Sequence, residues 1–221
     1  MSSLAAADAA DFVRRHTLPA SPPLLPELTL HLASELMPLW QATESSLAEA
    51  GLAPPYWAFA WVGGQALARY LLDAPESVRG KRVLDFAAGS GVAGIAAAKA
   101  GARTVTASEL EPLARAAIAL NAALNDVGVE ICGEDLTAAP AAGWDVILAG
   151  DVCYERPMAE RVAAWLSVAA GASCLVLLGD PGRAYLPRQG LVELACYMVP
   201  TTRELEDREC RETAVYRFDA R

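Results

Sequence analysis

The stretch KRVLDFAAGSGVAGIAAA, residues 81–98, decides the fold of this chain. Its apolar start predicts a strand over 83–85, and its alanine-rich end predicts a helix over 92–100, because alanine is a strong helix former. The tight turn between them, residues 89–91, contains two glycines, which let the backbone pass close to a bulky ligand. A strand, a glycine turn and a helix in this order open a nucleotide-binding α/β sheet.

The sequence of this turn fits two kinds of cofactor. Gly89, Gly91 and Gly94 satisfy the pattern G-x-G-x-x-G, which indicates a dinucleotide and an NAD-dependent oxidoreductase. Asp85 favours another group, because an acid at the end of the first strand followed by small residues resembles the pattern of class I S-adenosylmethionine-dependent methyltransferases. A carboxylate there lies near the amino group and sulfonium of that cofactor, whereas it repels a pyrophosphate. No residue stands out as a hydride-transfer catalyst, so we favour S-adenosylmethionine.

Charge and length limit the classes of partner. The formal net charge of −9 over 221 residues disfavours non-specific nucleic-acid binding, which needs a basic surface. The length predicts one domain with an N-terminal extension. The uncharged stretch 162–179 is divided by Gly171 and Ser173 into the end of a helix and a buried strand, which argues against a membrane span. We therefore expect neither a nucleic acid nor a membrane as partner.

The cysteines and histidines exclude several catalytic classes. The five cysteines are scattered and form no C-x-x-C, so we expect buried thiols in a reducing cytoplasm, without disulfides or a zinc site. His16 and His31 both precede the predicted core, which removes Ser-His-Asp and Cys-His catalysis there, and we expect no metal site. The chemistry must then come from a cofactor, carboxylates, aromatic rings and the backbone.

Acidic residues follow the next two predicted strands. The strand over 103–108 ends at Glu109, and a carboxylate at this position can accept hydrogen bonds from both hydroxyls of a ribose. The strand over 129–132 is followed by Asp135, which could accept a hydrogen bond from the amino group of an adenine or could cap a turn. Both acids are candidates for cofactor binding.

The fourth predicted strand, over 144–149, runs into Gly150, Asp151 and Tyr154. Ligands bind at the carboxyl ends of the strands in an open α/β sheet, so we expect Asp151 and Tyr154 where a methyl acceptor would lie. Trp61, which stands beside two glycines, is predicted to form a wall of the same pocket.

The remaining segments are assigned from hydrophobic periodicity and from the positions of proline and glycine. The segment over 191–198 fits either a helix or a strand, and 28–40 begins with a strand-like alternation and continues with helical spacing. The other predicted elements are helices over 4–16, 65–72, 113–125 and 156–170, a proline-rich segment over 18–26 that is either extended or turned, and strands over 173–178 and 213–218.

From residue 54 to residue 221 the chain resembles the seven-β-strand methyltransferases. More narrowly, it resembles the electron-transfer flavoprotein β-subunit lysine methyltransferases and their bacterial relatives. The stretches that carry the resemblance are PPYWAFAWVGGQALARYLLD, VLDFAAGSGVAGIAAAKAGA, GDVCYE and LLGDPGRAYLP. The combination of W-x-x-x-W-x-G-G-Q-A-L with G-D-P-G-R is more specific than the glycine motif. Two residues depart from the family pattern: Ala87 replaces a usual glycine, and Glu109 replaces a more frequent aspartate.

The resemblance implies an α/β fold with a Rossmann-like, seven-stranded methyltransferase sheet, mostly parallel with an antiparallel last strand. It divides the chain into a short N-terminal helical extension, residues 1–53, and a methyltransferase domain, residues 54–221. It implies S-adenosylmethionine as cofactor, S-adenosylhomocysteine as product, and Asp151 and Tyr154 as catalytic residues that orient and stabilise an arriving lysine amine. The implied cofactor-binding residues are Trp61, Gly63, Asp85, Ala87, Gly89, Gly91, Glu109, Asp135, Leu136 and Gly150.

The implied activity is N-methylation of a lysine on a protein, the β subunit of electron-transfer flavoprotein, by a monomeric cytoplasmic enzyme. The sequence does not distinguish a protein lysine from a small amine, because the same pocket accepts either. The alternatives are a methyltransferase for a small amine of the nicotinamide type or for another protein, an NAD-binding oxidoreductase, and a non-catalytic cofactor-binding scaffold.

Overall fold

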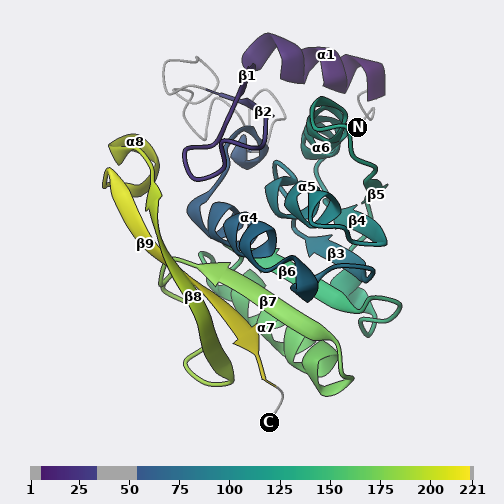
Figure 1. The fold of residues 1–221 in the computed structure, drawn as a ribbon, viewed down its shortest axis with the longest axis vertical. Helices are drawn as coiled ribbons and strands as arrows, with labels where there is room; N and C mark the ends of the chain where they lie inside the picture. The colour runs from purple at the N-terminus through teal and green to yellow at the C-terminus, as the bar shows by residue number, and fades with distance from the viewer. Residues whose placement is uncertain (1–5, 34–53, 220–221) are drawn as a thin grey trace.

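A seven-stranded sheet forms the centre of the computed structural model, which describes residues 6–33 and 54–219 (Figure 1). Its strands are β3 (Arg82–Phe86), β4 (Thr104–Ser108), β5 (Glu130–Cys132), β6 (Val146–Gly150), β7 (Leu175–Asp180), β8 (Leu191–Pro200) and β9 (Cys210–Phe218). They are ordered β5-β4-β3-β6-β7-β9-β8. The first five strands of that order are parallel, and β9 is antiparallel to both of its neighbours. The predicted sheet with an antiparallel last strand is therefore confirmed.

The two central strands, β3 and β6, are covered by helices on both sides. Val83, Leu84, Ile147 and Leu148 are each 0% exposed, as expected for the continuous apolar runs of a parallel sheet. Helices α4 (Val62–Asp73), α5 (Val92–Lys99) and α6 (Pro112–Leu124) lie on one face, and α7 (Arg156–Gly171) lies on the other (Figure 1). Across the two described ranges, no helix is both long enough and apolar enough to cross a membrane.

The N-terminal extension contains helix α1 (Ala6–His16) and a two-stranded antiparallel pair, β1 (Leu18–Ala20) and β2 (Leu30–Leu32). Figure 1 shows α1 beside α6, and the two helices are in contact. The side chain of Asn121 in α6 joins the extension to the glycine turn. Its Oδ1 accepts a hydrogen bond from the His31 N–H at 2.7 Å, and its Nδ2 donates to the carbonyl oxygen of Ser90 at 2.9 Å.

Three leucines of the extension complete the core of the sheet domain. Leu25, Leu28 and Leu30 are 0% exposed and pack among buried residues of α4 and α5. The described part of the extension is thus packed on the helices that cover the sheet. The predicted boundary after residue 53, and the second half of the predicted segment 28–40, lie outside the described residues.

The structure corrects the start of one predicted helix and decides one segment that the sequence left ambiguous. Helix α4 begins at Val62 instead of residue 65, so its first turn contains a pair of glycines. The ambiguous segment 191–198 is strand β8, which pairs with β9 along its length and is joined to it through the short helix α8 (Arg203–Glu206). Both outcomes depend on contacts with distant strands, which local periodicity does not contain.

The prediction that the cysteine thiols are buried is wrong for most of them. Cys153 is buried, Cys132 and Cys174 are partly buried, and Cys196 and Cys210 are exposed, all five as free thiols. Cys196 lies on the edge strand β8, and Cys210 is the first residue of the neighbouring strand β9. Many side chains of these two strands face solvent.

Candidate active site

A cavity of about 410 Å³ lies at the carboxyl ends of β3, β4 and β6. Cavities of roughly 300–1,000 Å³ are typical of small-molecule sites. The described residues of its wall include most of the predicted site, namely Trp61, Ala87, Gly89, Glu109, Asp135, Leu136, Gly150, Asp151 and Tyr154. Gly63, Asp85 and Gly91 are not part of that wall.

The turn after β3 forms one side of the cavity. Ala87 has φ of 51° and Gly89 has φ of 54°, so both adopt the left-handed conformation. Ala87 carries a steric strain that the usual glycine would avoid. A Cβ atom at Gly89 would meet no atom within 4 Å, so this position opens into the cavity and leaves room for a ligand.

Asp85 lies beneath the turn, behind the cavity wall. Its Oδ2 accepts a hydrogen bond from the Gly94 N–H at 2.8 Å, and burial raises the pKa of its carboxyl to about 7. Gly91 is the N-cap residue of α5 with φ of 77°, and a Cβ there would lie 3.2 Å from Ile118. Both residues shape the turn through buried contacts, and their direct contact with a cofactor stays a prediction.

Glu109 extends from the end of β4 to the glycine turn. Its Oε2 accepts a hydrogen bond from the Gly89 N–H at 3.1 Å, and its Oε1 accepts from the N–H groups of Leu110 at 2.8 Å and Glu111 at 3.3 Å. Glu111 lines the same wall, where burial and then the charge of Glu109 raise its pKa to about 7. The predicted ribose acceptor is therefore held by the backbone in a fixed orientation.

Asp135 caps a turn. Its Oδ1 accepts hydrogen bonds from the N–H of Thr137 at 3.0 Å and from the hydroxyl of the same residue at 2.6 Å. These bonds lower the pKa of Asp135 and fix the 3-10 turn η3 (Leu136–Ala138) at the cavity wall. The turn-capping alternative is thus present in the structure, while the contact with adenine stays a prediction.

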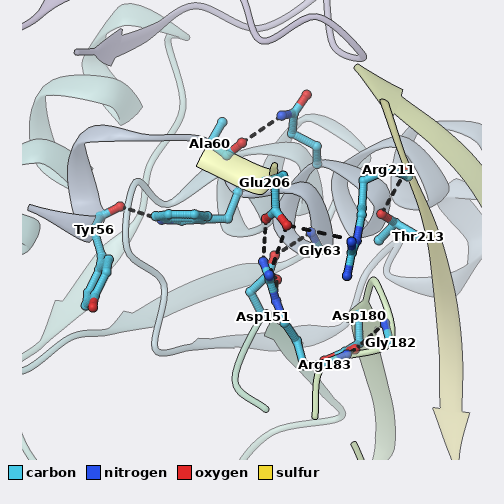
Figure 2. Close-up of polar contacts among 12 residues, drawn as sticks. Tyr56, Ala60, Gly63, Asp151, Asp180, Gly182, Arg183, Glu206, Arg211 and Thr213 are labelled. Atoms are coloured by element: carbon cyan, nitrogen blue, oxygen red, sulfur yellow. Dashed lines mark hydrogen bonds and ion pairs between the residues drawn. The ribbon is translucent and has the colours of Figure 1, made fainter. Parts of the chain in front are cut away.

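Five aromatic residues line the cavity, and three of them, Tyr56, Trp61 and Tyr154, are neighbours along one border. Trp61 lines it as predicted, and its Nε1 donates a hydrogen bond to the carbonyl oxygen of Tyr56 at 2.8 Å (Figure 2). The ring of Tyr56 lies 5.9 Å from Trp61 and 5.8 Å from Tyr154, measured between ring centroids. Tyr56 and Tyr154 are 43% and 46% exposed, so this aromatic border also faces solvent.

Asp151 is buried, and both of its carboxylate oxygens already have partners. Oδ1 accepts hydrogen bonds from Arg183 Nε at 2.9 Å and Nη2 at 2.7 Å, and Oδ2 accepts one from the N–H of Gly63. Burial raises the pKa of Asp151 to about 6, and Arg183 opposes that rise. Asp151 also has φ of 54°, a strained conformation of the kind that occurs at functional sites. The carboxylate that we expected to attract an amine is therefore held in an ion pair.

The close packing around Gly63 explains why this position has no side chain. A Cβ at this position would lie 2.6 Å from Oδ2 of Asp151 and would also collide with the carbonyl oxygen of Gly179. A Cβ at Gly150 would likewise lie 3.0 Å from the backbone of Gly64. The glycine pair thus lets the first turn of α4 lie directly on the ends of β6 and β7, while the contact of Gly63 with a cofactor stays a prediction.

The sequence interpretation missed several residues at this site. Arg183 lines the cavity, and its only signal was its place in the quoted motif G-D-P-G-R. Glu206 accepts hydrogen bonds from Arg183 Nη1 at 2.9 Å and from its Nη2, yet it comes from the β8–β9 hairpin and had no signal. Glu111 and Tyr56 also line the cavity and were not among the predicted site residues.

The strand order, the glycine turn after β3 and the acid after β4 together define the fold of a class I methyltransferase. Residues 66–152 match the family model described as ribosomal protein L11 methyltransferase (PrmA). The chain belongs to the electron transfer flavoprotein beta subunit lysine methyltransferase family, because it aligns with curated members over most of their length. It is a methyltransferase.

Two relatives and one solved structure show the extent of the likeness. The protein from Danio rerio is 35% identical over 204 residues, which cover 90% of this chain and 78% of the relative. The protein from Xenopus laevis is 36% identical over 214 residues, which cover 94% and 86%. Magnesium protoporphyrin IX methyltransferase from Synechocystis PCC 6803, with bound SAH, shares the fold at a TM-score of 0.51 and 19% identity, over 72% of this chain and 84% of that one.

Proposed function

We propose that this chain transfers a methyl group from S-adenosylmethionine to a lysine of the β subunit of electron-transfer flavoprotein. The family supports the substrate, since the curated relatives carry that name. The observation that carries the proposal is the cavity, which brings the glycine turn, Glu109, Asp151 and Tyr154 to one edge of the sheet. The monomeric state and the cytoplasmic location remain part of this proposal.

The cavity wall fits the cofactor. Gly89 opens into the cavity, and Glu109 keeps acceptor capacity on Oε2 beyond its one hydrogen bond, which suits a ribose hydroxyl. Leu136 and Asp135 lie on the wall where an adenine would follow that ribose. The aromatic border of Tyr56, Trp61 and Tyr154 is the part of the wall that we assign to the substrate chain.

The chemistry needs a neutral amine. S-adenosylmethionine supplies a methyl group on a positively charged sulfur. The lysine nitrogen forms a bond to that carbon as the carbon–sulfur bond breaks, the electron pair remains on sulfur, and one proton passes from nitrogen to water. A free lysine has a pKa of about 10.4, so a partly apolar cavity that disfavours the ammonium form helps the reaction. Asp151 orients the amine, and the ring faces of Tyr56 and Tyr154 stabilise the cation that forms.

The activity is tested with purified electron-transfer flavoprotein and labelled S-adenosylmethionine. We expect label on its β subunit, located to lysine by peptide mass spectrometry, and none on the partner subunit. Nicotinamide is offered in a parallel reaction as a small amine. Labelled nicotinamide without labelled protein would contradict the proposed substrate, and the absence of label from both would contradict methyl transfer to either.

Glu109→Gln is expected to weaken S-adenosylhomocysteine binding roughly 10- to 100-fold, because a charged hydrogen bond to a ribose hydroxyl contributes about 1.5–3 kcal/mol. Isothermal calorimetry measures the dissociation constant. The matched control is Glu130→Gln on β5, a residue outside the cavity wall, which should leave binding unchanged. Equal affinities for both variants would contradict the assignment of Glu109.

A further inference from the structure

Arg183 joins two buried carboxylates at the edge of the cavity. Its guanidinium donates to Asp151 on one side and to Glu206 on the other, as Figure 2 shows. The side chains of Asp151 and Glu206 are only 9% and 2% exposed, and that of Arg183 is 19% exposed. Buried charges are costly unless oppositely charged partners lie close to them, so the positions of these three side chains depend on one another.

Two separate parts of the chain fix the position of Arg183. The turn after β7 holds its backbone, because Oδ1 of Asp180 accepts hydrogen bonds from the N–H groups of Gly182 and Arg183, both at 2.7 Å. The β8–β9 hairpin holds its side chain through Glu206, whose other neighbour is Arg211 at 4.0 Å. Figure 2 shows Glu206 between the two arginines.

The charges around Asp151 come from several elements. Arg183 faces it as the cation in direct contact, the N–H of Gly63 from α4 donates to it, and the buried carboxyl of Asp180 from β7 opposes its ionisation. Cys153 and Tyr154, which follow Asp151 in the chain, are themselves affected by its charge. Without Arg183, burial and the charge of Asp180 would both disfavour the ionised form of Asp151. Only the hydrogen bond from the N–H of Gly63 would still stabilise it.

We propose that Arg183 is a positioning residue of the methyl-transfer site, which holds Asp151 ionised and oriented at the cavity edge, and that Glu206 from the β8–β9 hairpin holds Arg183. This inference rests on the proposed function of Asp151. The β8–β9 hairpin is the part of the sheet farthest along the chain from the glycine turn. Through Glu206, Arg183 and Asp151 it is connected to the reacting groups.

The first test measures the ionisation of Asp151 without substrate or cofactor. Carbon-13 aspartate labelling reports the titration of each carboxyl by nuclear magnetic resonance, and Asp151→Asn assigns the signal. We expect Arg183→Met to raise the titration midpoint by at least about one pH unit, because the carboxylate loses its adjacent cation. Arg183→Lys, which keeps the charge but loses the fork, should give an intermediate midpoint. The matched control, Arg82→Met, removes an arginine from an exposed pair with Asp145 at the other end of the sheet and should leave the midpoint unchanged.

The second test follows the rate. The Arg183→Met rate should be about half of the wild-type rate or less near pH 7, because a midpoint raised from about 6 to about 7 or above leaves at least half of Asp151 protonated there. The ratio of the two rates should rise towards one at pH 9 as Asp151 ionises in the variant. Glu206→Gln should lower kcat about threefold to tenfold with KM unchanged, because Arg183 loses one of its two anchors. Melting temperatures confirm that each variant is folded before it is compared.

The results of these two tests can be told apart from a failure of the proposed methyltransferase activity. An unchanged midpoint in a folded Arg183→Met protein would overturn the inference, and so would a tenfold loss of S-adenosylhomocysteine affinity at an unchanged midpoint, which would make Arg183 a cofactor ligand. An unchanged kcat for Glu206→Gln would overturn the part assigned to the hairpin. The absence of methylated flavoprotein would contradict the proposed function, while the midpoint would still test the positioning of Asp151.

Discussion

Asp151→Asn is expected to lower the rate of lysine methylation about 100-fold or more, the loss typical when a group that stabilises transition-state charge is removed. Asparagine keeps the size of the side chain and one acceptor for Arg183, but it brings no negative charge to the methyl-accepting amine. The dissociation constant of S-adenosylhomocysteine should change less than about threefold, because the predicted cofactor contacts lie elsewhere on the wall. Single-turnover kinetics measures the rate, and calorimetry measures the affinity.

The pH dependence gives this prediction a second, independent signature. The folded pKa of Asp151 is raised to about 6 by burial, above the value of about 4 for an exposed aspartate. The wild-type rate should therefore fall more steeply below pH 6 than the loss of neutral lysine alone predicts, and this additional fall should be absent in Asp151→Asn. The control is Asp145→Asn, an exposed acid paired with Arg82 at the opposite end of the sheet, which should retain the wild-type rate. A rate for Asp151→Asn within threefold of wild type would contradict the role of Asp151.

Gly63→Ala is expected to reduce the free energy of unfolding by about 2–3 kcal/mol, the usual effect of overpacking a rigid site. The added methyl group would lie 2.6 Å from Oδ2 of Asp151, with the carbonyl oxygen of Gly179 also within collision distance. Neither neighbour can move easily, because one belongs to a strand backbone and the other to the ion pair with Arg183. Denaturant titration and thermal melting measure the loss, which should lower Tm by roughly 5–10 °C.

The chain offers a matched glycine for this experiment. Gly128 has no atom within 4 Å of an added Cβ and does not adopt a left-handed conformation, so Gly128→Ala should change stability by no more than about 0.5 kcal/mol. Gly63→Ala should also slow methyl transfer, because the displaced Asp151 loses its N–H partner. Equal stability of the two variants would show that α4 and the strand ends separate without penalty, contrary to the packing described above.

The sequence predicted the parts of the fold that short-range chemistry controls. The strand, glycine turn and helix from β3 to α5 follow from glycine at the turn and alanine in the helix, and the acids after β4 and β6 lie at the cavity because parallel strands end at one edge. The ends of elements were harder to predict. Helix α4 starts early because Gly63 and Gly64 fit against two strand ends, a contact visible only in three dimensions.

The polar partners at the site could not be obtained from the sequence. Arg183 and Glu206 are separated in sequence by 23 positions, and Arg183 and Asp151 by 32, so no local spacing marks them as a cluster. The sheet order creates their contact, because β9 inserts between β7 and β8 and turns the hairpin back towards the cavity. For Asp85, the sequence predicted the position at the end of the strand but not the hydrogen-bond partner. Its carboxylate accepts a hydrogen bond from the buried N–H of Gly94.

The contact between Asn121 and the N-terminal extension also constrains the order of folding. The N–H of His31 and the side chain of Asn121 are 90 positions apart, and Leu25, Leu28 and Leu30 are buried against helices that follow them in the chain. A growing chain on the ribosome therefore presents these leucines to solvent long before α5 and α6 exist to cover them. Loop closure over such a separation is slow relative to local helix formation. These leucines, which are synthesised before the helices that cover them, are thus among the last residues to reach their native contacts, and the glycine turn acquires its Asn121 partner at the same late stage.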